Sequence, residues 1–240
     1  MGYAFSETSR INDENGGYLG FEITRWRNWR ISGYGDVFYF SGYKYGLGNA
    51  VKTLGYDAMA ELQYSRHAWR LSWRLRARQK GNATYSTRAQ FDWAQGSWSL
   101  RTTAEANLVP SNQSTISSFS EAAHSTILYG VSLAQDIAFD LTPYTVHHTP
   151  LSFRFRLQGF DAREWANRIY LYENDVLYAF SVPASYGLGG RMYLCLRWQI
   201  IPQMALYFRA SETVYAPSWA SGHDRKTTRT DLHLLLRAKL

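Results

Sequence analysis

The sequence predicts an all-β protein in which about 12 antiparallel strands form one transmembrane β-barrel domain over residues 1–240. Three observations lead to this prediction. Apolar and polar residues alternate along most of the chain. The alternating stretches run for about 11–15 residues, whereas soluble strands centre on about 5–6. Aromatic residues gather near the ends of these stretches.

The alternation is clearest in 68–79, where every second residue from Trp69 to Ala77 is apolar and the residues between them are Ser72 or arginine. Successive strand side chains point to opposite faces of a sheet, so this segment is a strand with one apolar and one charged face. Further segments alternate in the same way, the first two less cleanly: 17–27, 30–44, 54–64, 83–93, 97–108, 127–141, 151–158, 166–182, 191–200, 204–211 and 232–240. The parity of 166–182 slips at Glu173–Asp175, which predicts a β-bulge there.

The predicted connections differ in length. Tight turns are expected at 80–82, 95–96 and 201–202, and longer loops at 110–124, 143–150, 183–190 and 214–228. Strict up-and-down order places the last two long loops on the extracellular side and 110–124 on the periplasmic side, where short turns are usual. Either the strand count between 97 and 150 is wrong by one, or the protein has a long periplasmic loop.

A soluble β-sandwich shows the same alternation, so alternation alone does not separate it from a membrane barrel. The length of the strands and the positions of the tryptophans favour the membrane barrel. Seven tryptophans lie near predicted strand ends, as in the aromatic girdles of membrane barrels: Trp26, Trp29, Trp69, Trp73, Trp93, Trp98 and Trp198. No apolar run approaches about 18 residues, which excludes a helical membrane span. A soluble β-sandwich or barrel that binds sugars through exposed Trp and Tyr is the alternative from another class.

The charged face carries most of the chemical information, in a chain with a formal net charge of +7. If the apolar face meets lipid, these arginines point into the lumen: Arg70, Arg74, Arg76, Arg88, Arg101, Arg154, Arg156, Arg197, Arg209 and Arg237. The acidic residues are fewer: Glu22, Asp57, Glu61, Asp92, Glu105 and Asp136. Because buried charges need compensation and arginine pairs well with carboxylates, we favour a structural network that fills a narrow barrel. The alternative is a lumen whose arginines, from Arg70 to Arg197, bind an anionic solute.

No catalytic motif is present, so we expect a protein that is not an enzyme and that holds no cofactor or metal. His147 and His148 are adjacent, but no Cys or carboxylate cluster joins them. The single cysteine, Cys195, excludes a disulfide framework. Nucleic-acid binding by the barrel is not expected, because arginine and aromatic residues lie on opposite faces of each strand.

The segment Arg168–Pro183 reads RIYLYENDVLYAFSVP, and Tyr186–Gly187 and Gly190–Arg191 follow it. It resembles a signature in the C-terminal outer-membrane β-barrel of a family of Bacteroidota proteins that often carry N-terminal helix-hairpin-helix, competence-like repeats. The resemblance covers mainly 150–212 and marks five motif residues: Tyr172, Glu173, Asn174, Asp175 and Arg191. We expect Glu173 and Asp175 to hold the bulged strand through charge-assisted bonds to lumen arginines. This chain has no helix-hairpin-helix segment, so the resemblance does not carry a DNA-uptake role with it.

These observations predict a non-enzymatic channel or scaffold in a bacterial outer membrane. The alternative within the same fold is the membrane anchor of a DNA-uptake or secretion assembly. Expected partners are outer-membrane lipid, an anionic solute, and a periplasmic partner or missing N-terminal domain. Residues 1–7 contain no basic region followed by a hydrophobic core, so we expect either a cytosolic chain or one that lacks its signal peptide.

Overall fold

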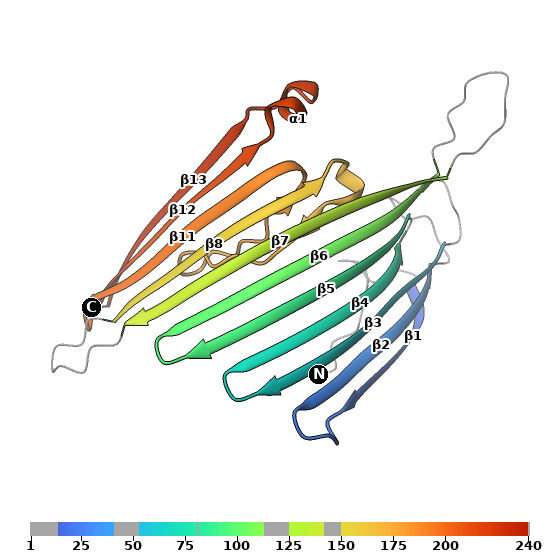
Figure 1. Ribbon diagram of the computed structural model, residues 1–240, viewed down its shortest axis with the longest axis horizontal. Helices are drawn as coiled ribbons and strands as arrows, with labels where there is room; N and C mark the ends of the chain where they lie inside the picture. Colours follow the sequence, from blue (N-terminus) through green and yellow to red (C-terminus); the bar gives the residue numbers. More distant parts are fainter. Residues whose placement is uncertain (1–13, 41–52, 81, 113–124, 142–149, 240) are drawn as a thin grey trace.

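The computed structural model describes residues 14–40, 53–80, 82–112, 125–141 and 150–239, most of which lie in strands (Figure 1). The long strands are β1 (Glu14–Ile23), β2 (Trp29–Phe40), β3 (Thr53–Arg66), β4 (Trp69–Lys80), β5 (Asn82–Gln95), β6 (Trp98–Asn112), β7 (Ser125–Leu141), β8 (Leu151–Ala162), β11 (Gly187–Ile201), β12 (Met204–Tyr215) and β13 (Thr228–Ala238). The short elements are the 3-10 helix η1 (Trp165–Asn167), β9 (Ile169–Tyr170), β10 (Ala184–Ser185) and the helix α1 (Pro217–Gly222).

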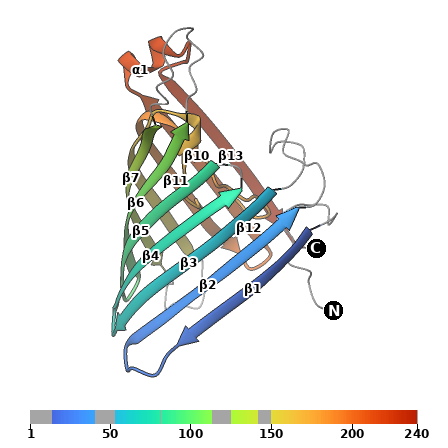
Figure 2. The same cartoon turned by 90° about the vertical axis from the view of Figure 1, so that its right-hand side faces the viewer.

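Eleven strands form a single sheet in the order β1-β2-β3-β4-β5-β6-β7-β8-β11-β12-β13. Every neighbouring pair is antiparallel, so the chain runs up and down across the sheet. The prediction of an all-β protein with a large antiparallel sheet is confirmed. Seen from the side, the sheet is strongly curved and has a concave and a convex face (Figure 2).

The predicted sheet strand over 166–182 is wrong. Residues 163–186, which we call the insert, leave the sheet and form η1, β9 and β10, and the last two pair with each other. A sheet strand here would place Glu173 and Asp175 on one face and Asn174 on the other, and one of these faces would be the apolar one. The segment instead folds onto the concave face, where its polar groups find partners.

Because 166–182 does not cross the sheet as a strand, the long loops no longer fall on opposite ends of it. Four long connections now leave the sheet at the same end: 41–52, 113–124, 163–186 and 216–227. We call this the long-connection end, although the break between β4 and β5 also lies there. The opposite, short-turn end holds the turns 67–68, 96–97 and 202–203, together with 24–28 and 142–150. The expected long periplasmic loop at 110–124 is therefore wrong, because the connection 113–124 leaves the sheet at the same end as 216–227.

The edges of the sheet are β1 and β13, which are not paired with each other in the described chain. Because the number of strands is odd, β1 and β13 run in the same direction. The structure thus contains a curved sheet of 11 strands, where the sequence predicted a closed barrel of about 12.

The convex face is apolar and exposed. Leu71 on β4, Leu133 on β7 and Leu234 on β13 keep 53%, 60% and 72% of their surface accessible. Among the described residues no second layer covers this face. Buried apolar side chains lie instead where the insert meets the concave face, as Ile169 packs with Ala134 of β7.

Candidate functional site

The insert lies along the concave face and is held by side chains of the sheet. Arg88 of β5 donates from Nη2 to the carbonyl oxygen of Tyr170 at 3.2 Å, and Arg156 of β8 donates from Nη1 to that of Tyr172 at 2.7 Å. Apart from the short β9–β10 pair, the insert has no strand to pair with, so its buried carbonyl groups need such side-chain donors.

Glu173, near the middle of the insert, is completely buried between two arginines of the sheet. Arg191 of β11 donates from Nε and Nη2 to its two carboxylate oxygens at 2.7 and 3.0 Å, and Arg209 of β12 donates to one of the same oxygens. Arg191 also donates to the hydroxyl of Thr213 at 2.6 Å, and Asp175 lies 3.7 Å from Arg209. We call Glu173, Arg191 and Arg209 the buried triad.

The fold brings together the five residues of the motif: Tyr172, Glu173, Asn174, Asp175 and Arg191. Asn174 donates from Nδ2 to the phenolic oxygen of Tyr193 at 3.1 Å, and Asp175 lies 2.8 Å from Nδ1 of His233. Glu173 makes the charge-assisted bonds to arginines that the sequence analysis expects, whereas Asp175 contacts Arg209 only at 3.7 Å and is hydrogen-bonded to His233. These contacts fasten the insert to β11, β12 and β13, whereas the sequence assigned them to a bulged strand.

A row of alternating charges crosses the concave face toward the short-turn end. Register places Arg70 opposite Asp92, Asp92 opposite Arg101, Arg101 opposite Asp136 and Asp136 opposite Arg156, on β4 to β8. Arg156 donates to both oxygens of Asp136 at 2.7 and 2.8 Å, and Arg101 donates to Asp92. Each carboxylate of this charge row therefore lies between two arginines of neighbouring strands.

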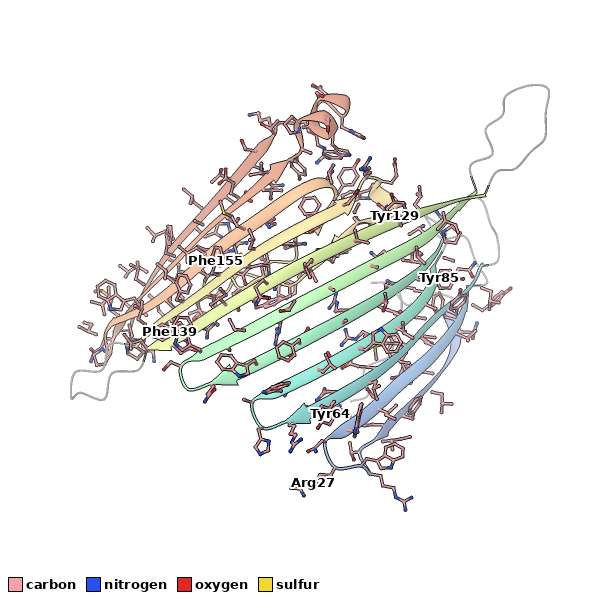
Figure 3. All side chains as sticks on the ribbon, in the orientation of Figure 1. Arg27, Tyr64, Tyr85, Tyr129, Phe139 and Phe155 are labelled. Carbon is pink, nitrogen blue, oxygen red and sulfur yellow. The ribbon has the colours of Figure 1, made fainter. Side chains whose placement is uncertain are left out.

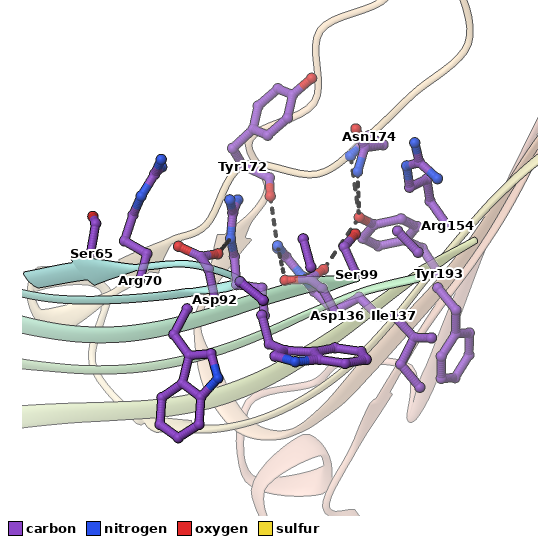
Figure 4. A pocket seen from close by; sticks show the side chains of 18 of the residues that line it. Ser65, Arg70, Asp92, Ser99, Asp136, Ile137, Arg154, Tyr172, Asn174 and Tyr193 are labelled. Atoms are coloured by element: carbon purple, nitrogen blue, oxygen red, sulfur yellow. Dashed lines mark hydrogen bonds and ion pairs between the residues drawn. The ribbon is translucent and has the colours of Figure 1, made fainter. Parts of the chain in front are cut away.

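A cavity of about 500 Å³ lies over the charge row, and the insert forms its opposite wall (Figure 4). Tyr172 and Asn174 line it from the insert, and Tyr193 reaches in from β11. Arg70, at one end of the row, has no carboxylate within salt-bridge distance among the residues that the structure describes. Its guanidinium is the least compensated cation at this cavity.

A second row of charges crosses β3 to β6, nearer the long-connection end. Arg74 and Arg88 lie directly opposite each other on β4 and β5, a placement that destabilises a sheet unless the charges are compensated. Arg74 donates to Glu61 of β3 at 2.6 Å, and Arg88 donates to Glu105 of β6 at 2.8 Å. The two carboxylates thus flank the two arginines and balance them.

The strand registers place all eight predicted lumen arginines on the concave face. Six of them form salt bridges: Arg74, Arg76, Arg88, Arg101, Arg154 and Arg156. The partner of Arg76 is Asp57, and that of Arg154 is Asp140. Arg197 lies instead over an aromatic ring of β12, at 5.7 Å from the ring centre. This arrangement has the geometry of a charge-compensated network.

Aromatic residues of the convex face include a row near each end of the strands, and Figure 3 labels Tyr64 and Phe139 near one end and Tyr85 and Tyr129 near the other. At the short-turn end, tryptophans pair with rings on neighbouring strands at centroid distances of 4.5–5.9 Å: Trp29 with Tyr64, Trp69 with Phe91 and Trp98 with Phe139. Tyr85 and Tyr129 mark the row at the long-connection end, where both are exposed. Six of the seven tryptophans predicted near strand ends lie at or next to the short-turn end, whereas Trp73 is the fifth residue of β4 and lies in the strand interior.

The sequence analysis missed the polar residues that complete the buried contacts, such as Tyr193, Ser211 and Thr213. Their signal was available, because they share the alternation parity of Arg191 and Arg209 on β11 and β12. Alternation does not reveal the insert, whose Asn174 donates to Tyr193 and whose Glu173 accepts from the same Arg191 that donates to Ser211 and Thr213.

Within the described ranges, no group of three or more His, Cys, Asp or Glu side chains is placed to hold a metal ion. His147 and His148 lie outside those ranges. Cys195 is buried on the concave face, with its Sγ 3.8 Å from the carbonyl oxygen of Asp175.

None of the helices in the described part of the chain is both long enough and apolar enough to cross a membrane. Comparison with known proteins finds no matching protein family, no matching curated protein and no matching solved structure.

Proposed function

We propose that the protein is an integral β-barrel of a bacterial outer membrane and that it acts as a non-enzymatic scaffold whose lumen is occupied by the insert. The convex face is the observation that carries this proposal. Large apolar side chains are exposed on it from β1 to β13, as Leu19 and Leu232 illustrate. Soluble monomers rarely expose apolar patches beyond a few hundred Å², whereas this is the side that a membrane barrel turns to lipid.

The spacing of the two aromatic rows supports the same conclusion. Tyr129 and Phe139 are separated by ten residues of β7, which corresponds to about 33 Å along a strand at about 3.3 Å per residue. A tilt of about 40° reduces this to a height of about 25 Å, the height of the apolar band on outer-membrane barrels.

Polar groups inside this band are paired with each other. Thr102 donates to Gln135 at 2.6 Å, and the indole of Trp73 donates to Thr87 at 2.9 Å, both pairs on the convex face. Polar groups in the hydrocarbon core of a bilayer need such partners, because each unsatisfied group there costs several kcal/mol. A soluble sugar-binding sandwich would instead cover this face with a second sheet, and among the described residues the only second sheet, β9 with β10, belongs to the insert on the concave side.

Closure of the sheet belongs to this proposal, since open strand edges do not occur in lipid. Direct pairing of β1 with β13 would be parallel, because the two edges run in the same direction. An additional strand between them would pair with both in the antiparallel sense. Either arrangement places the concave face and the insert in a lumen.

The insert and its ion pairs favour a scaffold over a conducting channel. It lies along the concave face from β5 to β13, and six of the eight predicted lumen arginines form salt bridges with carboxylates. The alternative form of scaffold is the membrane anchor of a DNA-uptake or secretion assembly, a role that the resemblance of Arg168–Pro183 to the Bacteroidota signature does not carry by itself. A channel that conducts anions along the charge row is the less favoured function.

Electrophoretic migration tests the proposal. After refolding in detergent, the unboiled protein is expected to resist SDS and to run faster than the boiled protein. In a planar lipid bilayer the same sample is expected to show no steady conductance. A protein that is soluble without detergent and shows no shift would contradict the membrane assignment, and a stable anion current would contradict the scaffold.

A substitution in the middle of the convex face gives a quantitative test. Leu133→Arg places a charge at the centre of β7, where lipid makes it unfavourable by about 2–4 kcal/mol. Leu54→Arg is the matched control, because Leu54 is equally exposed but lies at the end of β3, where the expected effect is about 0–1 kcal/mol. Guanidinium unfolding in lipid vesicles measures both. Equal, small losses of stability at the two positions are expected of a soluble protein and would contradict the membrane assignment.

A further inference from the structure

A second cavity, of about 560 Å³, lies at the long-connection end between the returning half of the insert and β11 to β13. The triad arginines Arg191 and Arg209 form part of its floor, and residues after α1 form part of its rim. In Figure 1, α1 lies at this end of β12 and β13. The cavity is separate from the one over the charge row and shares none of its lining residues.

One side of this cavity is a wall of aromatic rings that hold each other in place. Tyr186 packs edge-on against Trp165 at 5.4 Å and against Trp219 at 5.2 Å, and Phe160 packs edge-on against Tyr215 at 6.2 Å. Interlocked rings of this kind present a rigid apolar surface and lose little side-chain entropy when a ligand covers them.

The rim carries a cation that has no carboxylate partner. The guanidinium of Arg225 lies 5.0 Å from the ring centre of Tyr186 and 5.9 Å from that of Trp219. Among the described residues no carboxylate lies within salt-bridge distance of Arg225. Cation–π contacts position a guanidinium without neutralising it, so its forked donors remain available to an anion.

Hydroxyl and other polar groups cover the remaining lining. Ser181, Ser185 and Thr213 supply hydroxyls, and Asp231 and His233 project from β13. A second arginine at the rim, Arg229, is largely exposed, and its contact with Asp231 at 3.5 Å is correspondingly weak. The cavity therefore combines an apolar wall, one or two available cations and many hydrogen-bonding groups.

We propose that this cavity binds an acidic saccharide, with the sugar ring against the aromatic wall and its carboxylate on Arg225. A ring face needs an apolar platform, ring hydroxyls need donors and acceptors, and a carboxylate needs an arginine fork. The cavity volume is within the usual range of small-molecule sites, about 300–1,000 Å³. This inference goes beyond the proposed scaffold function and does not rest on it, because the cavity lies between insert and sheet whether or not lipid surrounds the convex face.

Saturation-transfer NMR on the refolded full chain in detergent tests the site, with sodium glucuronate as the probe. We expect a dissociation constant of about 1 mM, with glucose, acetate and benzoate each at least about tenfold weaker. Arg225→Gln is expected to weaken glucuronate binding about tenfold, the usual consequence of losing a charged hydrogen bond. Lys226→Gln is the matched control, because it removes a neighbouring cation that does not line the cavity.

Three results would overturn the proposal in a sample that retains its folded tryptophan spectrum. They are the absence of saturation transfer at about 50 mM glucuronate, equal binding by Arg225→Gln, and tighter binding of benzoate than of glucuronate. A competition arm then separates the two sources of such a sugar. Displacement of glucuronate by mixed micelles of the same detergent that contain a glucuronosyl diacylglycerol assigns the site to a glycolipid headgroup, and retention assigns it to a free solute.

Discussion

Two halves of the concave face use the same chemistry in different surroundings. In the open half, on β2 to β4, Arg74 binds Glu61 while keeping 42% of its side chain exposed. In the covered half, on β8 to β12, the insert seals Arg191, Arg209 and Glu173 so that none is more than 8% exposed. Exposed ion pairs contribute about 0–1 kcal/mol, whereas breaking a buried pair costs about 3–5 kcal/mol. The insert, and not the number of arginines, therefore sets what these ion pairs contribute to stability.

The largest effect is expected from Glu173→Gln. The substitution keeps the shape of the side chain but leaves Arg191 and Arg209 buried without their shared carboxylate, which destabilises the fold by about 3–5 kcal/mol. Guanidinium unfolding of the refolded protein measures the loss, and protease cleavage within 163–186 reports whether the insert leaves the sheet. Unchanged stability would show that the covered half is no different from the open half.

Asp136→Asn probes the boundary between the two halves. Asp136 accepts two bonds from Arg156, which in turn holds the insert through Tyr172. Loss of these charged bonds is expected to cost about 1.5–3 kcal/mol. Asp92→Asn is the comparison, because Asp92 lies at the more exposed end of the charge row. The unfolding midpoints of the two variants show how the loss of stability changes along the row. A larger loss of stability for Asp92→Asn than for Asp136→Asn would contradict this prediction.

Gly130→Ala tests the insert by packing instead of charge. An added Cβ at Gly130 of β7 would lie 2.4 Å from the carbonyl oxygen of Asn167 in η1, so η1 must move and the fold should lose about 1–3 kcal/mol. Gly159→Ala on β8 is the control, because nothing lies within 4 Å of the added atom. Hydrogen exchange of the insert amides should rise in the first variant and stay unchanged in the second.

The smallest effect is expected from Glu61→Gln in the open half. Its bond to Arg74 is partly exposed, so the expected loss is about 0–1 kcal/mol and should shrink as salt is added. Unfolding at low and high ionic strength checks both statements. A loss as large as that of Glu173→Gln would mean that the open half is also sealed in the folded protein.

The strands could be read from the sequence because their signal is local. Trp69 to Ala77 alternate with polar residues, and that alternation survives whichever strand lies next to β4. The same pattern assigned Arg70 and Arg156 to the charged face without any knowledge of register. Closure of the sheet and its placement in a membrane are global properties, which a period of two does not decide.

The insert could not be read in this way, although its motif could be singled out. Within 166–182 the local pattern resembles a strand, and the parity slip at Glu173–Asp175 is equally compatible with a bulge. Glu173 is paired with arginines 18 and 36 residues away, on two strands that follow it. The favourable burial of that carboxylate exists only once β11 and β12 stand side by side.

The sequence by itself therefore determined where the eleven long strands lie and which face of each is polar, because period-two alternation is a property of consecutive residues. Only the tertiary structure decided that residues 163–186 leave the sheet and that the long connections share one end. It also decided which carboxylate each arginine meets. Those outcomes depend on strand register and on burial by a distant segment, and neither is encoded in any short stretch of the chain.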